Sequence, residues 1–273
     1  MMIQYRVRGW TYFVTAFVGL VILAPFAWMV STALMTTSQT LQVPPNIIPS
    51  PVTLDGAREV FNRLPFATLL WNTVIVSIGR VIGTVIICSM AAYALAIIKV
   101  PGSKIILVVI LALIMVPGDI FIIPSYSIIT SMGLTDTLVA LALPSLFDVF
   151  GVFLLYQFFR GVPRELIEAA RIDGASHLRI LATIVAPLAR SGIISLAILT
   201  TLAEWKELLW PIVVNRSIEK MTLGPGIALL RGEYTTDWNV LMAAGVLAAL
   251  PMIAIFLILQ KRFIASFARS GLK

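Results

Sequence analysis

Few side chains of this sequence could carry out a chemical reaction. It contains one His, His177, and one Cys, Cys88, which lies inside an apolar run and has no second Cys for a disulfide. No group of His, Cys, Asp and Glu has the spacing of a metal site. The sequence also lacks the G-x-x-x-x-G-K-[ST] phosphate loop, so we expect no cofactor and no ATP hydrolysis on this chain.

The more informative polar residues are ionisable side chains within or near long apolar stretches. They are Arg80, Asp119, Asp148, Glu204, Lys206 and Glu207. A charge exposed to lipid is costly, so such residues usually face a bundle interior or a water-filled cavity. One interpretation is internal ion pairing, for example of Arg80 with Asp119 or Asp148. The alternative is that these side chains line a solute path or a subunit interface.

The last three of these charges form a cluster. Glu204 and Glu207 lie three residues apart and share a helix face, whereas Lys206 falls on a different face. The two carboxylates would repel each other unless they meet a cation or a partner. His177 is expected at the surface, on the polar side of its segment.

Composition indicates a membrane protein. Of the 273 residues, 59% are hydrophobic and only 12% are charged, against roughly 25% in a soluble domain. These charges are too few to cover a soluble surface. The 20 Lys and Arg outnumber the 13 Asp and Glu, but they are spread over short segments, so we expect no nucleic acid as a partner.

Six stretches are long and apolar enough to cross a bilayer core of about 30 Å as helices. They cover about residues 10–34, 69–98, 105–129, 138–159, 193–214 and 240–259. The predicted fold class is therefore an all-α polytopic membrane protein, surrounded by lipid. The first stretch is longer than the roughly 7 to 15 apolar residues of a cleaved signal peptide.

The Lys and Arg residues orient these stretches. With the N-terminus in the cytoplasm, the outer loops carry five of them: Arg58, Arg63, Arg216, Lys220 and Arg231. The inner segments then carry thirteen: Arg6, Arg8, Lys99, Lys104, Arg160, Arg164, Arg171, Arg179, Arg190, Lys261, Arg262, Arg269 and Lys273. Positive charge favours the cytoplasmic side, so both termini are predicted to be cytoplasmic.

The inner segment at residues 160–190 predicts a helical hairpin. Pro163 suits the start of a helix that continues to Asp173, and Glu165 favours its positive N-terminal end. Gly174 can adopt the left-handed conformation that ends a helix, and Ser176 can cap a second short helix.

This hairpin has two interpretations. The shallow face at Ala169 and Ala170 would let another protein approach the backbone closely. The alternative is an amphipathic connector at the membrane surface that only joins two spans.

Several residues of the hairpin carry a family resemblance. Glu168-Ala169-Ala170, Asp173-Gly174-Ala175, Ile184 and Pro187 resemble the EAA loop of binding-protein-dependent ABC importers. The resemblance extends from about Pro65 to the C-terminus and favours the smaller permease subunit of maltose-type carbohydrate importers. Its other stretches are Asn72-Thr73, Ala91–Ala94, Pro101-Gly102, Val116–Gly118 with Ile123-Pro124, Phe150–Phe159, Leu209–Ile212, Gly232–Tyr234 with Asp237-Trp238, and Met242–Ala244.

Two stretches depart from the family pattern. Ala186-Pro187 is followed by Ser191, where the family usually has Leu-Pro and a second proline. Residues 203–207 read Ala-Glu-Trp-Lys-Glu, where the family commonly has a Trp-Asn-Asp-like cluster. The second departure leaves the solute open among a disaccharide, an oligosaccharide, a polyol and a glycerol-phosphate compound.

The resemblance implies a type I ABC importer permease fold in a bacterial or archaeal inner membrane. Residues 1–66 would hold the N-terminal tail, the first span and an outer segment, residues 67–262 the five-helix core, and residues 263–273 a cytoplasmic tail. The implied partners are a second permease subunit, an ATPase dimer that binds ATP and Mg, an extracytoplasmic solute-binding protein and a sugar-like substrate.

The resemblance also implies site residues. The side chains that would couple the chain to the ATPase are Glu165, Glu168, Ala169, Ala170, Asp173, Gly174 and Ala175. The six charges within the spans become candidates for the translocation path or subunit interface, where Glu204 and Glu207 could meet a polyhydroxyl ligand.

Two other classes of protein fit the sequence less well. A stand-alone secondary transporter would use intramembrane carboxylates to bind protons or sodium, but it would show paired repeats and would not need the EAA hairpin. An intramembrane enzyme would need a catalytic constellation, which one His and one Cys do not supply.

Overall fold

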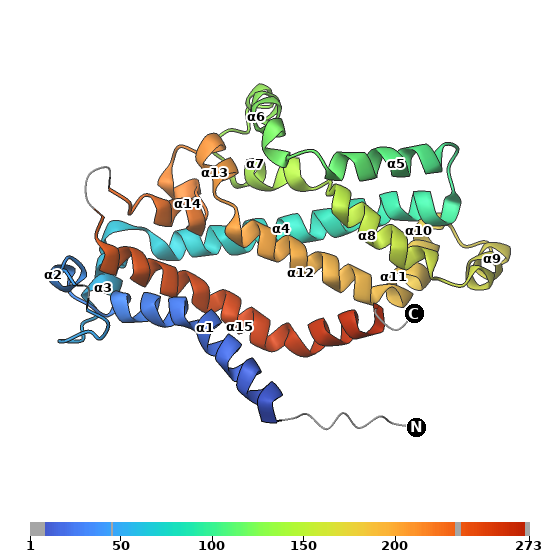
Figure 1. Ribbon diagram of the computed structural model, residues 1–273. Helices are drawn as coiled ribbons and strands as arrows, with labels where there is room; N and C mark the ends of the chain where they lie inside the picture. Colours follow the sequence, from blue (N-terminus) through green and yellow to red (C-terminus); the bar gives the residue numbers. More distant parts are fainter. Residues whose placement is uncertain (1–8, 45, 233–235, 271–273) are drawn as a thin grey trace. The chain divides into compact units, whose positions relative to one another are not determined.

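The computed structural model describes residues 9–44, 46–232 and 236–270, and the side chains of 10–44, 46–232 and 236–257. Every regular element in these ranges is a helix (Figure 1). Arg6, Arg8 and Lys273 of the charge argument and Glu233 and Tyr234 of the family resemblance lie outside the described residues.

The chain divides into two compact units. The first unit comprises residues 1–66 and 226–255. Its elements are α1 (Gly9–Ala33), α2 (Thr37–Thr40), α3 (Asp55–Arg63) and most of α15 (Trp238–Ser270).

The second unit comprises residues 67–225 and 256–273. Its long helix α4 (Phe66–Tyr93) continues as the π-helical turn η1 (Ala94–Ile98). The elements that follow are α5 (Ser103–Ile114), η2 (Gly118–Phe121), α6 (Ile122–Ser131), α7 (Leu138–Ala142), η3 (Leu143–Ser145), α8 (Val149–Arg160), α9 (Arg164–Ile172), α10 (His177–Ile180), η4 (Leu181–Val185), α11 (Ala186–Leu188), α12 (Arg190–Lys206), α13 (Leu209–Val214), η5 (Ile218–Lys220) and α14 (Leu223–Ala228).

The described residues hold three single helices that are long and apolar enough to cross a membrane, at Trp10–Ala33, Phe66–Ile98 and Trp238–Leu257. Three bent pairs bring the total to as many as six spans. They are Ser103–Ile114 with Gly118–Ser131 (99°), Leu138–Ser145 with Val149–Arg160 (53°), and His177–Leu188 with Arg190–Lys206 (85°).

Continuous helices over 105–129, 138–159 and 193–214 were therefore a wrong expectation. Each of these stretches is interrupted, at 115–117, at 146–148 and at 207–208. Pro117, Pro144 and Pro211 stand at or near the three breaks. A proline ring clashes with the carbonyl four residues earlier and removes a backbone donor, so a helix cannot pass through these points undisturbed.

The core of the second unit joins α4, α8, α12 and the hairpin. Phe159, Ile180, Val185 and Leu196 are fully buried in one cluster. Gly192 permits this packing, because a Cβ there would lie 2.5 Å from the ring of Phe158. Close packing through small residues is what holds helices together in lipid, where the hydrophobic effect contributes little.

Polar side chains hold the loop at residues 215–223 in place within the same unit. Asn72 Nδ2 donates to the carbonyls of Glu219 and Met221 at 2.8 and 2.9 Å. Asp136 accepts from the backbone N–H groups of Arg216 and Ser217, both at 3.0 Å, and from the Ser217 hydroxyl.

The hydrogen bonds of Asp136 predict that the stability of the fold depends on pH. The Ser217 hydroxyl, with the backbone N–H groups behind it, holds the pKa of Asp136 below its ordinary value. A carboxylate with a lowered folded-state pKa stabilises the fold above its unfolded pKa of about 3.9, and this contribution is lost as pH falls through the folded pKa. The melting temperature of the chain should therefore exceed that of Asp136→Asn between pH 5 and 7.

That difference should begin to narrow below about pH 4, in thermal unfolding followed in detergent. Asp55→Asn, on an exposed residue of the first unit, serves as the control. A difference that stays constant from pH 7 to pH 3 would contradict the assignment.

Candidate functional site

One cavity of about 640 Å³ lies in the second unit, and all three interrupted stretches contribute to its wall. The first break supplies Gly118 and Asp119, the second supplies Phe147 and Asp148, and the third supplies Glu207. Arg80 of α4 closes the wall. The breaks therefore shape a hollow between helices that would otherwise pack together.

The backbone groups freed by the breaks find polar partners. Pro144 displaces the helical bond to the Ala140 carbonyl, which accepts from Trp210 Nε1 at 3.0 Å. The Ser145 carbonyl accepts from the Thr84 hydroxyl at 3.3 Å. Cys88 Sγ donates to the Asp148 carbonyl at 3.4 Å, which gives the single cysteine a structural role.

Two of the cavity carboxylates cap the helices that restart after a break. Asp148 Oδ1 accepts from Phe150 N at 3.0 Å at the start of α8, and Glu207 Oε1 accepts from Trp210 N at 3.3 Å at the start of α13. Such capping satisfies N–H groups at the positive end of a helix. Asp119, in the first turn of η2, is exposed.

Arg80 and Glu204 form a buried ion pair between α4 and α12. Arg80 Nη1 lies 2.7 Å from Glu204 Oε2, and their side chains are 15% and 1% exposed. Arg80 therefore forms an internal ion pair, as one of its two interpretations had it, but the example partners Asp119 and Asp148 were wrong. Asp148 is engaged in capping, and the sequence gives no direct signal that α12 faces α4 at this level.

The three charged residues at 204–207 therefore have different surroundings. Glu204 meets a cation, as its burial requires. Lys206 ends α12 with an exposed side chain that does not line the cavity, and Glu207 continues in extended conformation. Of the six candidate path residues, the structure brings Arg80, Asp119, Asp148 and Glu207 to the cavity wall.

The hairpin has the local structure that its sequence predicts. Helix α9 follows Pro163 and ends at Ile172, shortly before a left-handed Gly174 whose φ is +79°. The N–H groups of Gly174 and Ala175 donate to the carbonyls of Arg171 and Ala170 at 3.0 and 2.9 Å, the Schellman pattern of a helix end. Ser176 then caps α10 through the Arg179 N–H.

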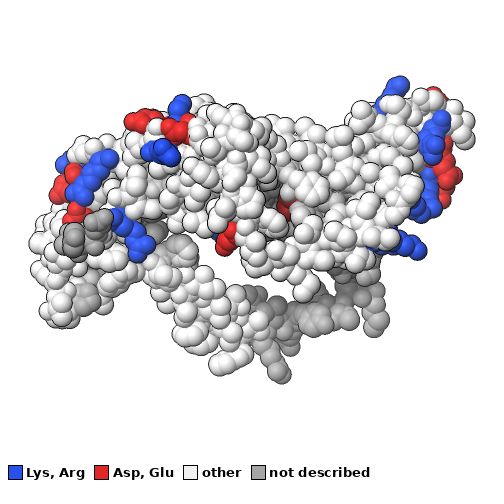
Figure 2. Space-filling model, turned by 90° about the horizontal axis from the view of Figure 1, so that it is seen from above, with Lys and Arg blue, Asp and Glu red and all other residues white. Residues whose placement is uncertain are grey.

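The residues that resemble the EAA loop differ in how far they are buried. Glu165, Glu168, Ala169, Asp173 and Gly174 are exposed. Ala170 and Ala175 pack partly against the core that also buries Ile167, Ile180 and Val185. Figure 2 shows mixed basic and acidic side chains at the end of the second unit that α9 occupies in Figure 1. The hairpin therefore offers a charged outer face on a buried apolar base.

His177 is exposed, as expected, but its ring also contacts α4. Its Nδ1 lies 3.2 Å from Tyr93 Oη, and the two rings meet edge to face. This contact ties the second helix of the hairpin to α4, a role that the sequence did not predict.

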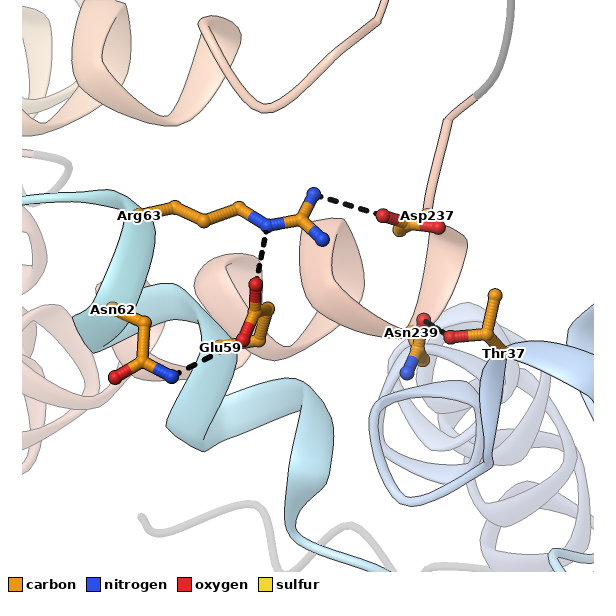
Figure 3. Close-up of polar contacts among 6 residues, drawn as sticks. All are labelled: Thr37, Glu59, Asn62, Arg63, Asp237 and Asn239. Carbon is orange, nitrogen blue, oxygen red and sulfur yellow. Dashed lines mark hydrogen bonds and ion pairs between the residues drawn. The ribbon is translucent and has the colours of Figure 1, made fainter.

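A second polar cluster lies in the first unit (Figure 3). Arg63 contacts Glu59 at 2.7 Å and Asp237 at 2.8 Å, and the Thr37 hydroxyl donates to Asn239 Oδ1 at 3.3 Å. The hydrogen bond from Arg63 lowers the pKa of Glu59. The cluster joins α2 and α3 to the start of α15, and sequence analysis missed it because its members lie far apart in the chain.

Comparison with known proteins identifies the chain. A model of the family described as "Binding-protein-dependent transport system inner membrane component" matches residues 7–269. The chain belongs to this family. It is a multi-pass protein of the bacterial inner membrane and a transport subunit, and in such systems ATP hydrolysis takes place on a separate subunit.

Two curated relatives cover most of the chain. The sn-glycerol-3-phosphate transport system permease protein UgpE of Brucella suis biovar 1 (strain 1330) is 30% identical over 90% of this chain and 91% of that protein. The arabinooligosaccharides transport system permease protein AraQ of Halalkalibacterium halodurans is 34% identical over 82% of this chain and 81% of that protein.

A solved structure shares the fold. It is a bacterial ABC transporter involved in the import of the acidic polysaccharide alginate, with a TM-score of 0.78 at 22% sequence identity. The match covers 92% of this chain and 94% of the matched chain. The observed helices therefore form an ABC importer permease fold.

The buried ion pair gives a prediction for stability. Arg80→Ala leaves the Glu204 carboxylate buried without its cation, so the free energy of unfolding should fall by about 3 kcal/mol. Replacing both residues with apolar ones, Arg80→Met with Glu204→Leu, should recover most of this loss. Chemical unfolding in mixed micelles measures the free energy of unfolding of the single and the double variant.

Arg58→Ala is the matched control, because it breaks an exposed pair with Asp55 that is worth at most about 1 kcal/mol. Equal losses for Arg80→Ala and Arg58→Ala would show that the buried pair does not stabilise the fold.

Proposed function

We propose that this chain is the permease subunit of an importer for a carbohydrate or related polyhydroxyl solute, and that its cavity forms half of the translocation path. The observation that carries the proposal is the convergence of three helix breaks, at 115–117, 146–148 and 207–208, on one hollow with charged walls. The names of the two curated relatives, which specify glycerol phosphate and arabinooligosaccharides, support this solute class.

The hairpin is the coupling element in this proposal. The outer face of α9, with Glu165, Glu168, Ala169 and Asp173, docks on an ATPase subunit, and Gly174 sets the bend behind it. Ala170 and Ala175 hold that face on the core. Because the base of the hairpin packs in the same core as α4, α8 and α12, a displacement of α9 reaches helices that line or support the cavity.

The proposed assembly contains two permease subunits, an ATPase dimer that binds ATP and Mg, and an extracytoplasmic solute-binding protein. Both termini lie in the cytoplasm, in line with the charge bias of thirteen to five. The binding protein then approaches from the side of the outer loops, including residues 215–223. Residues 67–262 act as the transport core, residues 1–66 as the N-terminal tail, first span and outer segment, and residues 263–273 as a cytoplasmic tail.

Two substitutions test the docking face. Glu168→Lys reverses an exposed charge on α9, and Gly174→Val places a branched side chain on a left-handed backbone, at a cost of roughly 1–2 kcal/mol. A Cβ at Gly174 meets no atom within 4 Å, so the cost arises from the backbone alone. Both variants should insert normally but retain less ATPase subunit during purification from membranes and show lower uptake.

The controls are Gly174→Asn, since Asn tolerates the left-handed conformation, and Glu219→Lys, which reverses an exposed charge on the outer loop. Full ATPase retention and uptake by Glu168→Lys and Gly174→Val would refute the docking assignment.

A further inference from the structure

The charges of the cavity wall do not balance. Arg80 is the one basic residue among the described residues that line it, and Glu204 matches its charge at 2.7 Å. Three further carboxylates, Asp119, Asp148 and Glu207, line the same cavity. Within the described part of the chain, no other Lys or Arg of the cavity wall offsets them.

Helix capping only partly offsets this excess. Asp148 and Glu207 sit at the N-terminal ends of α8 and α13, each equivalent to about half a positive charge. The helix α13 is short, so its contribution is smaller still. Asp119 is exposed on the cavity wall.

Because Glu204 is buried, it stays paired with Arg80 and continues to neutralise the charge of Arg80. The Glu204 side chain is 1% exposed, and its second oxygen, Oε1, has no hydrogen-bond partner among the described residues. A buried carboxylate without its cation would be costly, so Arg80 is not free to attract an anion. On the face shown in Figure 2, acidic patches with no basic neighbour lie in a hollowed part of the surface.

We propose that this chain's half of the path excludes anionic solutes and admits uncharged or cationic hydroxylated ones. The inference rests on the proposed function, since it specifies the substrate class of the same cavity. Carboxylates accept strong hydrogen bonds from hydroxyl and ammonium groups but repel phosphate and uronate groups. A cleft of one charge sign with low-dielectric walls changes local ion concentrations by about 10- to 1,000-fold.

Two related systems are named for anionic substrates, which this selectivity would exclude. The import of sn-glycerol 3-phosphate and of acidic alginate both require passage of an anion. A neutral arabinooligosaccharide, as in the name of the other relative, would meet no such barrier.

Charged thiol reagents test the field in the cavity directly. Cys88 is the only cysteine of the chain, and Cys88→Ser keeps a donor for the Asp148 carbonyl. In that background Ser125→Cys places one thiol on the cavity wall. The full chain in nanodiscs reacts with two methanethiosulfonate reagents, one carrying a trimethylammonium group and one a sulfonate. The rate of each reagent at position 125 is divided by its rate with Leu41→Cys, a thiol at an exposed position.

The cationic reagent should react at least about tenfold faster than the anionic one at position 125. Adding Asp119→Asn should reduce the ratio several-fold, whereas the control Asp55→Asn, on an exposed acid of the first unit, should leave it unchanged. A ratio near one, or faster reaction of the sulfonate, would overturn the proposal, as would a ratio insensitive to Asp119→Asn.

This result is separable from the proposed function. The reagent ratio requires no ATPase, binding protein or known solute, whereas the coupling variants at Glu168 and Gly174 are measured by ATPase retention. A cation-selective cavity in a chain that binds no ATPase would refute the importer role and leave the charge selectivity standing. A chain that binds the ATPase but shows no charge preference would support the importer role and refute the charge selectivity.

Discussion

The need to satisfy backbone polar groups away from water governs the second unit of this protein. A continuous helix in lipid bonds its own N–H and C=O groups, so each break must be compensated by other parts of the chain. Thr84, Cys88 and Trp210 donate to carbonyls around the second break, while Asp148 and Glu207 accept from N–H groups where helices restart. These compensations allow a cavity to exist inside an otherwise apolar bundle.

The same compensations explain why charged residues persist in the spans. Asp148 and Glu207 serve the backbone, and Arg80 with Glu204 joins α4 to α12 beside the cavity. The charges that remain unbalanced face the hollow. In the proposed function, structural and transport roles therefore fall on the same few side chains, and a change of one alters both the shape and the charge of the cavity.

The features that sequence could predict are those with local causes. The left-handed Gly174 and the cap at Ser176 follow from neighbouring residues, and the spans follow from length and hydropathy. The partner of Arg80 could not be predicted, because it depends on how α12 packs against α4, 124 residues away. The breaks were signalled by Pro117 and Pro144, but hydropathy alone treats a broken span and a straight one alike.

In the proposed function, ATP bound to a partner subunit changes access to the cavity through the hairpin. The most direct measurement is the reaction rate of a neutral maleimide with Ser125→Cys, in the Cys88→Ser background, in the assembled importer with and without ATP and vanadate. A change of at least about fivefold is expected if nucleotide shifts the cavity between two states. Equal rates in a complex that binds and hydrolyses ATP would contradict the claim.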